Sequence, residues 1–286
     1  MILTVTLNAA IDKVYQVDSF EVDKVFRTTN MWQTAGGKGL NVSRVATILG
    51  SKVTASGFLG GRAGDFISEQ IEKEGIIDGF AATAGETRTC IAINDSVKGT
   101  STEVLESGPE ISQEEREAFI EKYKKLVKDA SIIALSGSLP RGVPADFYGT
   151  LIDIGREQGE KVILDTSGPA LEAGIKHKPY MIKPNINELE ALVGKSLNKE
   201  GILDAARDIH KAGVELVCIT LGSEGCIAVT NEGAFRLQPP KVDAINAVGS
   251  GDSFVAGCAI SLSQNKAIID VLKTGIPRFS LQPLIE

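Results

Sequence analysis

Short apolar strand patterns alternate with helical patterns along most of this 286-residue chain. The strand patterns cover residues 2–7, 52–59, 131–135, 161–165, 180–183 and 215–221, and the helical patterns include 64–74, 144–158 and 200–212. Such alternation predicts an α/β fold with a mostly parallel sheet and helices on both faces. Ligands of such sheets bind beyond the carboxyl ends of the strands. We therefore expect a site where loops follow residues 7, 135, 183 and 221.

A glycine-rich turn before an apolar helical pattern is the strongest candidate for chemistry. Gly249, Ser250 and Gly251 precede Asp252, and the pattern from Ser253 to Leu262 predicts a buried helix. The start of a helix directs free N–H groups and a positive dipole toward a bound anion. A carboxylate at such a place fits a general base that acts beside a phosphate. An ordinary helix cap explains Asp252 equally well at this point.

A second glycine cluster covers residues 35–41 and precedes a helical pattern that ends near Leu49. Gly36 and Gly37 would let a ligand approach the backbone, and Lys38 and Asn41 could then bind a polyol or its phosphate. The cluster is not a Walker A loop, because it lacks the required Gly-Lys-Ser/Thr ending. A plain strand-to-helix turn remains the alternative.

Two further loops follow predicted strands. Lys183, Asn185 and Glu188 stand at the start of a predicted helix. The amide and the carboxylate suit a hydrated Mg²⁺ ion, although a glutamate in a first helical turn is common without any metal. The second loop runs from Thr220 to Gly225 and, by itself, is more typical of a hairpin turn than of a nucleotide site.

Composition limits the partners. Lys plus Arg number 30 against 37 Asp plus Glu, which gives a net charge of −7 and argues against nucleic acid. No apolar run approaches the length of a membrane span, and the N-terminus lacks a leader pattern, so we expect a cytoplasmic protein. The four cysteines form no paired motif and are expected to be buried free thiols.

Five motifs occur together in a fixed order: Gly-Gly-Lys-Gly, Gly-Ser-Leu-Pro, Lys-Pro-Asn-x-x-Glu, Thr-x-Gly-x-x-Gly and Gly-Ser-Gly-Asp. This set resembles the ribokinase-like carbohydrate kinases, over residues 1 to about 275. Within that family it is similar to the kinases of sugar phosphates. The amino-acid sequence around residues 34–40, 85–93 and 248–252 most resembles that of tagatose-6-phosphate kinases, with 1-phosphofructokinases as the alternative.

The resemblance implies a fold, a reaction and ligands. It implies a single domain over 1–286: a three-layer sandwich plus a small β lid, which two predicted hairpins near 13–34 and 88–106 would form. The implied reaction transfers phosphate from ATP, with Mg²⁺, to a ketohexose phosphate. The lid would cover the sugar and pair two chains into a homodimer. A sugar-phosphate-binding protein of weak activity is the second hypothesis.

The resemblance also implies roles for individual residues. Asp252 would be the base, and the N–H groups of Gly249, Ser250 and Gly251 would bind the moving phosphoryl group. The sugar phosphate would contact Asp12, Arg27, Gly36, Gly37, Lys38, Asn41, Arg88 and Ser138. ATP would contact Lys183, Thr220, Gly222, Ser223 and Gly225, and Asn185 and Glu188 would lie around Mg²⁺.

The chain departs from the family pattern at three places. Ala9 stands where the family has proline, and Phe26 stands where it has asparagine. After Gly275 the family continues with helices, whereas this chain has Pro277 and Pro283, which cannot occupy a normal helix interior. The tail therefore predicts an altered end of the ATP site.

Overall fold

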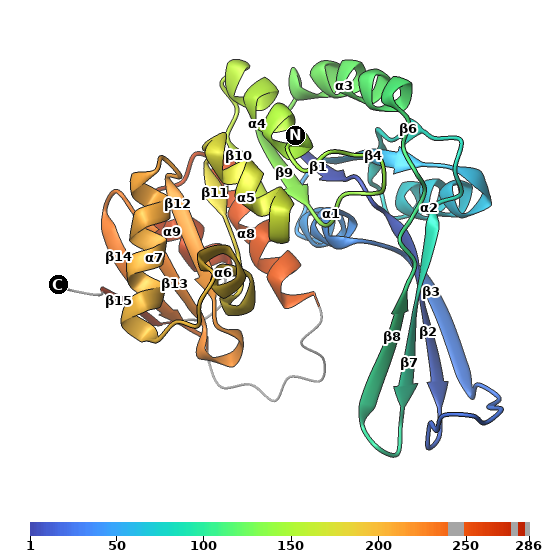
Figure 1. Ribbon diagram of the computed structural model, residues 1–286. Helices are drawn as coiled ribbons and strands as arrows, with labels where there is room; N and C mark the ends of the chain where they lie inside the picture. Colours follow the sequence, from blue (N-terminus) through green and yellow to red (C-terminus); the bar gives the residue numbers. More distant parts are fainter. Residues whose placement is uncertain (240–248, 276–279, 284–286) are drawn as a thin grey trace.

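A large, mostly parallel sheet forms the centre of the molecule, as the computed structural model shows for residues 1–239, 249–275 and 280–283 (Figure 1). Its strands lie in the order β15-β14-β13-β12-β11-β10-β9-β1-β4-β5, with β6 beside β4. Their bounds are β1 Ile2–Thr6, β4 Val53–Leu59, β5 Ile77–Asp78, β6 Ala81–Ala82, β9 Ile132–Ser136, β10 Val162–Asp165, β11 Met181–Ile182, β12 Leu216–Thr220, β13 Cys226–Thr230, β14 Gly233–Gln238 and β15 Ser280–Pro283.

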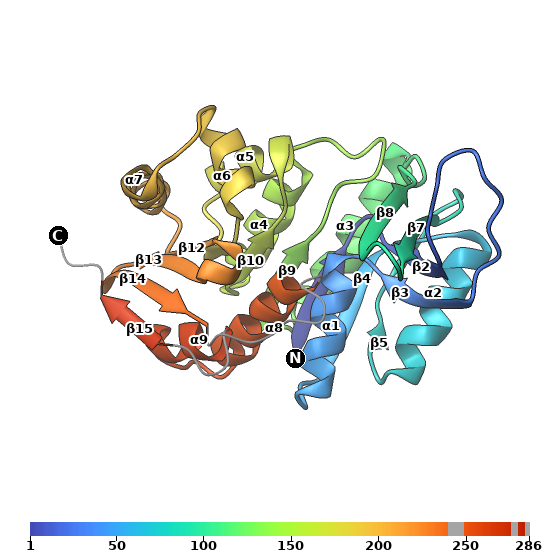
Figure 2. The same ribbon diagram turned by 90° about the horizontal axis from the view of Figure 1, so that it is seen from below.

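Helices cover both faces of this sheet (Figure 2). One layer contains α1 Lys38–Ile48, α2 Gly61–Lys73, α8 Ser250–Ser263 and α9 Ile268–Gly275. The other contains α3 Gln113–Val127, α4 Phe147–Glu157, α5 Gly168–Lys176, α6 Ile186–Val193 and α7 Lys199–Lys211. Successive strand residues point to opposite faces, so Ile132 packs in one core and Ile133 in the other. The predicted three-layer, mostly parallel arrangement is confirmed.

Helix α5 has no counterpart in the sequence prediction.

The strands beyond β12 are not parallel to the rest of the sheet. The turn after β12 leads directly into the antiparallel hairpin of β13 and β14. The loop 220–225 is therefore the hairpin turn that its glycines suggest, closed by the short 3₁₀ helix η1 Gly222–Glu224. Beyond α9, residues 280–283 add an edge strand antiparallel to β14. Residues 276–279 and 284–286 of the unusual tail, including Pro277, lie outside the described residues.

A second, smaller sheet contains four strands in the order β3-β2-β7-β8. These are β2 Ala10–Val17, β3 Asn30–Gly36, β7 Arg88–Asp95 and β8 Thr100–Leu105. Figure 1 shows this sheet extending away from the three layers. The two predicted hairpins are thus present, and β2 and β7 join them in parallel. We call this sheet the lid.

One buried carboxylate holds the outer ends of the two lid hairpins together. Asp95 accepts hydrogen bonds from the backbone N–H groups of Ser19 and Phe20 in one hairpin, at 3.1 and 2.7 Å. It also accepts from Val97 and Lys98 in its own turn, both at 2.9 Å. These backbone hydrogen bonds, that of Lys98 first, lower the pKa of Asp95. Asp95 therefore stabilises the lid above its unfolded pKa, and this contribution is lost as the pH falls through the lower folded value.

We expect Asp95→Asn to loosen the lid without unfolding the main sheet, because one amide oxygen cannot serve four donors. At neutral pH, hydrogen exchange at Ser19, Phe20, Val97 and Lys98 should accelerate by roughly tenfold, the effect of losing a charge-assisted hydrogen bond. Exchange in β1 and β9 should stay the same. Asp23→Asn is the control, because Asp23 is exposed in the same lid. Equal exchange in both variants would contradict this role of Asp95.

The structure also bears on two properties predicted from composition. All four cysteines are buried free thiols, which confirms the prediction. Within the described ranges, no helix combines the length and the apolar character needed to cross a membrane.

Candidate active site

The candidate residues gather at the carboxyl edge of the main sheet. Asp165 ends β10, Lys183 follows β11, and Thr220 ends β12, so three neighbouring strands deliver them to the same edge. The first turns of α1 and α8 face this edge and supply Lys38 and Asp252. This is where ligands of parallel sheets bind.

Helix α8 begins without a side-chain cap. Its N-cap is Gly249, at φ 81°, a left-handed conformation that favours glycine, and among the described residues no side-chain cap bonds the first turn. Asp252 lies inside that first turn. The alternative that Asp252 is an ordinary helix cap is therefore wrong. The N–H groups at the helix start are available to an anion instead.

The Asp252 carboxylate bonds a neighbouring helix. Asn41 of α1 donates its Nδ2 hydrogen to Asp252 Oδ2 at 2.8 Å. Only 7% of Asp252 is exposed, and this burial raises the pKa of its carboxyl group. The Asn41 hydrogen bond opposes the shift, as do the charges of Lys38 and Lys183, whereas Asp165 adds to it. The result is a carboxylate with a raised proton affinity beside two ammonium groups.

Asp165 holds both of those ammonium groups, and the sequence analysis did not select it. Its Oδ1 atom lies 3.3 Å from Lys38 Nζ and 3.3 Å from Lys183 Nζ. Burial alone would lower the pKa of Lys38, but the charges of Asp165, Glu188 and Asp252 outweigh it and raise the pKa. Lys38 thus stays charged at neutral pH. The one available signal was a carboxylate as the last residue of a buried strand.

Asn185 and Glu188 form a reciprocal capping box at the start of α6. Glu188 N donates to Asn185 Oδ1, and Asn185 N donates to Glu188 Oε2, both at 2.9 Å. Glu188 thus stands in a first helical turn, as the alternative to metal binding stated, and the pair also caps the helix. Glu188 Oε1 lies 4.0 Å from Lys38 Nζ. In the described part of the chain, no cluster of three or more His, Cys, Asp or Glu side chains could hold a metal ion.

The loops at the predicted ATP end lie next to each other. Asn185 and Thr220 form an isolated parallel bridge, and Thr220 N donates to Pro184 O at 3.0 Å. Gly222 and Ser223 belong to the 3₁₀ turn that Gly225 ends. A pocket of about 380 Å³ adjoins this turn, with Ile186 and Leu221 among its lining residues.

The predicted sugar end lies where the lid joins the body. Gly36 ends β3, and a Cβ atom there would lie 2.0 Å from Asp12 Oδ2, so only glycine fits beside this carboxylate. Burial raises the pKa of Asp12, although Arg88, the Gly37 amide and Arg44 oppose the shift. Asp12, Gly36 and Gly37 are thus brought together as predicted.

Asn8, which the sequence analysis did not select, connects two predicted phosphate contacts. Arg88 donates from Nε and Nη2 to the Asn8 carbonyl, at 3.2 and 2.9 Å, and Asn8 Nδ2 donates to Ser138 Oγ at 3.2 Å. Arg88 Nη1 donates to Glu106 O at 3.0 Å. Arg27 is not part of this group, because it is exposed between β2 and β3 in the lid.

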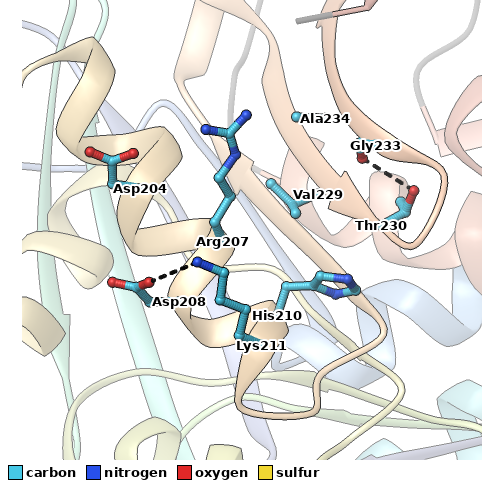
Figure 3. A pocket seen from close by; sticks show the side chains of 9 residues that line it. All are labelled: Asp204, Arg207, Asp208, His210, Lys211, Val229, Thr230, Gly233 and Ala234. Carbon is cyan, nitrogen blue, oxygen red and sulfur yellow. Dashed lines mark hydrogen bonds and ion pairs between the residues drawn. The ribbon is translucent and has the colours of Figure 1, made fainter. Parts of the chain in front are cut away.

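A pocket away from this edge contains none of the predicted residues (Figure 3). It measures about 550 Å³ and lies between α7 and the hairpin of β13 and β14. Because β13 runs antiparallel to β12, the turn between Thr230 and Gly233 is at the sheet edge opposite to Thr220. This pocket is separate from the candidate active site.

Comparisons with known proteins identify the family of the chain. Residues 4–276 match the pfkB family carbohydrate kinases, and the chain belongs to that family. It is similar to phosphofructokinase-2 from Escherichia coli at 28% identity and a TM-score of 0.91, over 96% of this chain and 91% of that one. It is also similar to a Thermotoga maritima protein described as a possible 1-phosphofructokinase, at 25% identity and a TM-score of 0.86, over 100% of both chains.

These findings establish the class of enzyme. The fold is ribokinase-like, with a mostly parallel sheet and a small four-stranded lid. The protein is a phosphotransferase with an alcohol group as acceptor, in a family that uses ATP. The sequence prediction of the family and the enzyme class is confirmed.

We expect Asp165→Asn to lower the free energy of unfolding by roughly 3 kcal/mol, as when one partner of a buried ion pair is removed. Lys183, at 5% exposure, should account for most of this loss, because Lys38 is more accessible and screened by water. Urea unfolding at pH 7.5 measures it. Asp146→Asn is the matched control, because Asp146 is exposed and makes no cap hydrogen bond in α4. A loss no larger than the control's would contradict the argument.

Proposed function

We propose that this enzyme transfers the terminal phosphoryl group of ATP to a ketohexose phosphate, most favourably converting D-tagatose 6-phosphate to D-tagatose 1,6-bisphosphate. One observation carries the reaction type. A buried carboxylate, Asp252, stands in the first turn of an uncapped helix, close to two ammonium groups that a second carboxylate holds. This arrangement combines a base, an anion site and fixed cations.

In this proposal, Asp252 takes the proton from the sugar hydroxyl group while the oxygen of that hydroxyl group bonds to phosphorus. The bond between the terminal phosphorus and the bridging oxygen breaks, and the electron pair leaves with ADP. The N–H groups of Gly249, Ser250 and Gly251 face the charge on the moving group. The raised pKa of Asp252 suits this role, because a base with higher proton affinity accepts the hydroxyl proton more readily.

The sugar phosphate would lie between the lid and the edge of the sheet. Asp12, Gly36, Gly37 and Asn41 would contact its hydroxyl groups. Arg88 and Lys38 would offset the charge of its phosphate in a protein of negative net charge, with Ser138 as a hydroxyl donor. The connection of Arg88 to Ser138 through Asn8 supports this assignment.

Arg27, which is exposed in the lid, would meet the phosphate of a second copy of the chain that pairs through the lid. The lid exposes large apolar side chains, among them Trp32 and Leu105, which supports such a homodimer.

The nucleotide would lie along Lys183, Thr220, Gly222, Ser223 and Gly225. The charge of Lys183 and the adjoining loops support this placement. Mg²⁺ keeps most of its waters in such sites and uses few protein oxygens. Asn185 and Glu188 would hold the hydrated ion. The buried Asp165 Oδ2, which has no hydrogen-bond partner among the described residues, could accept from one of its waters. When bound, the ion would neutralise charge on the ATP phosphates.

The choice of tagatose 6-phosphate rests on the sequence of the motifs, and the comparisons support two alternative substrates. Phosphofructokinase-2 from Escherichia coli, solved in complex with fructose-6-phosphate, is 27% identical to this chain over 96% of this chain and 91% of that one, with a TM-score of 0.90. The possible 1-phosphofructokinase supports fructose 1-phosphate. These substrates differ in hydroxyl configuration or in the position of the phosphate.

Asp252→Asn should lower kcat by roughly 10²–10⁴-fold, because the amide cannot accept the proton. KM values should change far less, since ground-state contacts remain. Burial raises the pKa of Asp252, so its stabilising contribution is present below the unfolded pKa and is lost as the pH rises through the folded value. The Asn variant should therefore melt at the same or a higher temperature at pH 8. An Asn variant with normal kcat would refute the mechanism.

We expect kcat/KM for tagatose 6-phosphate to exceed that for fructose 1-phosphate and fructose 6-phosphate by at least about tenfold, a difference that the placement of one hydroxyl can produce. A coupled assay of ADP release, with the three sugar phosphates in parallel, measures it. If fructose 1-phosphate is preferred, the enzyme is a 1-phosphofructokinase. If fructose 6-phosphate is preferred, its specificity is that of the Escherichia coli relative.

A further inference from the structure

Arg44 of α1 makes three directed contacts close to the candidate base. Its Nε donates to Glu74 Oε2 at 3.0 Å, at the end of α2, and its Nη2 donates to Ala35 O at 2.8 Å, in the last part of β3. Its Nη1 donates to Asn41 Oδ1 at 3.3 Å, one helical turn earlier. A guanidinium group can serve three acceptors in fixed directions, and a lysine cannot.

The contact with Asn41 decides which way the Asn41 amide points. An amide has an accepting oxygen on one side and a donating NH₂ group on the other, whereas a guanidinium group only donates. Arg44 can therefore face only the oxygen of Asn41. The NH₂ group must then point the other way, where it donates to Asp252 Oδ2 at 2.8 Å.

We propose that Arg44 is a positioning residue that fixes the Asn41 amide with its NH₂ group toward Asp252, so that a donor and not an acceptor faces the base. The inference rests on the proposed role of Asp252. Without Arg44 the amide could turn over and present its oxygen to Asp252. That oxygen would accept a hydrogen bond from the protonated carboxyl group and so favour the form that cannot act as a base.

The other charged groups that face Asp252 do not depend on Arg44. Lys38 comes from α1, Asp165 from the end of β10, and Lys183 from the residue after β11. The two lysines favour the ionised carboxylate and Asp165 disfavours it, and Asp165 fixes both lysines independently of Arg44. A change at Arg44 should therefore reach Asp252 through the Asn41 amide.

Arg44→Met tests the inference through the pH dependence of kcat/KM, with whichever of the three sugar phosphates the natural enzyme uses. Losing the Asn41 NH₂ donor raises the pKa of Asp252 further. The acid limb of the kcat/KM profile should therefore move to a pH higher by roughly one unit. At pH 8 kcat should remain within about twofold of the natural enzyme, because Asp252 is then ionised in both. Ionisation of the substrate phosphate is common to both enzymes and cancels in the comparison.

Arg44→Lys keeps the charge and should show the same shift, because an ammonium group cannot make the three contacts. Arg156→Met is the control for loss of an arginine, because Arg156 is exposed and its one side-chain hydrogen bond within the described ranges goes to His177 O. Its pH profile should match that of the natural enzyme. A loss of kcat in Arg44→Met that is equal at every pH would mean general damage to the fold and would overturn the proposal.

A double-mutant cycle shows whether Arg44 acts through Asn41. In an Asn41→Ala background, Arg44→Met should leave the acid limb where it is. An equal shift in that background would mean that Arg44 acts by another route, such as its charge near Asp12, and would overturn the proposal. If turnover is too slow to profile, the ¹³C shift of the Asp252 carboxyl group gives its pKa, with Asp252→Asn assigning the signal. A natural enzyme without turnover would instead contradict the proposed function.

Discussion

The Asp165 carboxylate lies between two ammonium groups that come from different parts of the chain. Lys38 belongs to the first helix, and Lys183 follows a strand deep in the second half. In water these two cations would repel each other, and a fully enclosed anion between them removes that cost. Because both cations are fixed by one carboxylate at the end of β10, the positive field beside Asp252 exists before any phosphate binds.

The main sheet and the lid supply different residues to the site. The sheet delivers Asp165, Lys183 and Thr220 to one edge, because parallel strands all end there. The lid delivers Asp12 and Arg88 from the neighbouring parallel strands β2 and β7, two register positions apart. Gly36 and Gly37 connect the lid to α1, so the predicted sugar contacts and the candidate base meet where the two sheets join.

The sequence predicted much of this fold for identifiable reasons. Strand–helix alternation is a local pattern and predicted the parallel sheet, and the apolar run after a glycine turn predicted the buried helix α8. Asp165 was missed because its partners are 127 residues earlier and 18 residues later, and no local pattern reports such pairing. The Asn185 and Glu188 pair shows another limit: the same spacing suits the capping box that the structure shows and the Mg²⁺ site that we propose, so no local pattern separates the two roles.

The most direct test of the account is to follow phosphate transfer itself. The natural enzyme would be mixed with ATP, Mg²⁺ and each sugar phosphate, and the products observed by ³¹P nuclear magnetic resonance. The account predicts that ADP forms together with a second phosphate ester on the sugar, in equal amounts, with little inorganic phosphate. ADP with inorganic phosphate and no new ester would show hydrolysis in place of transfer and would contradict it.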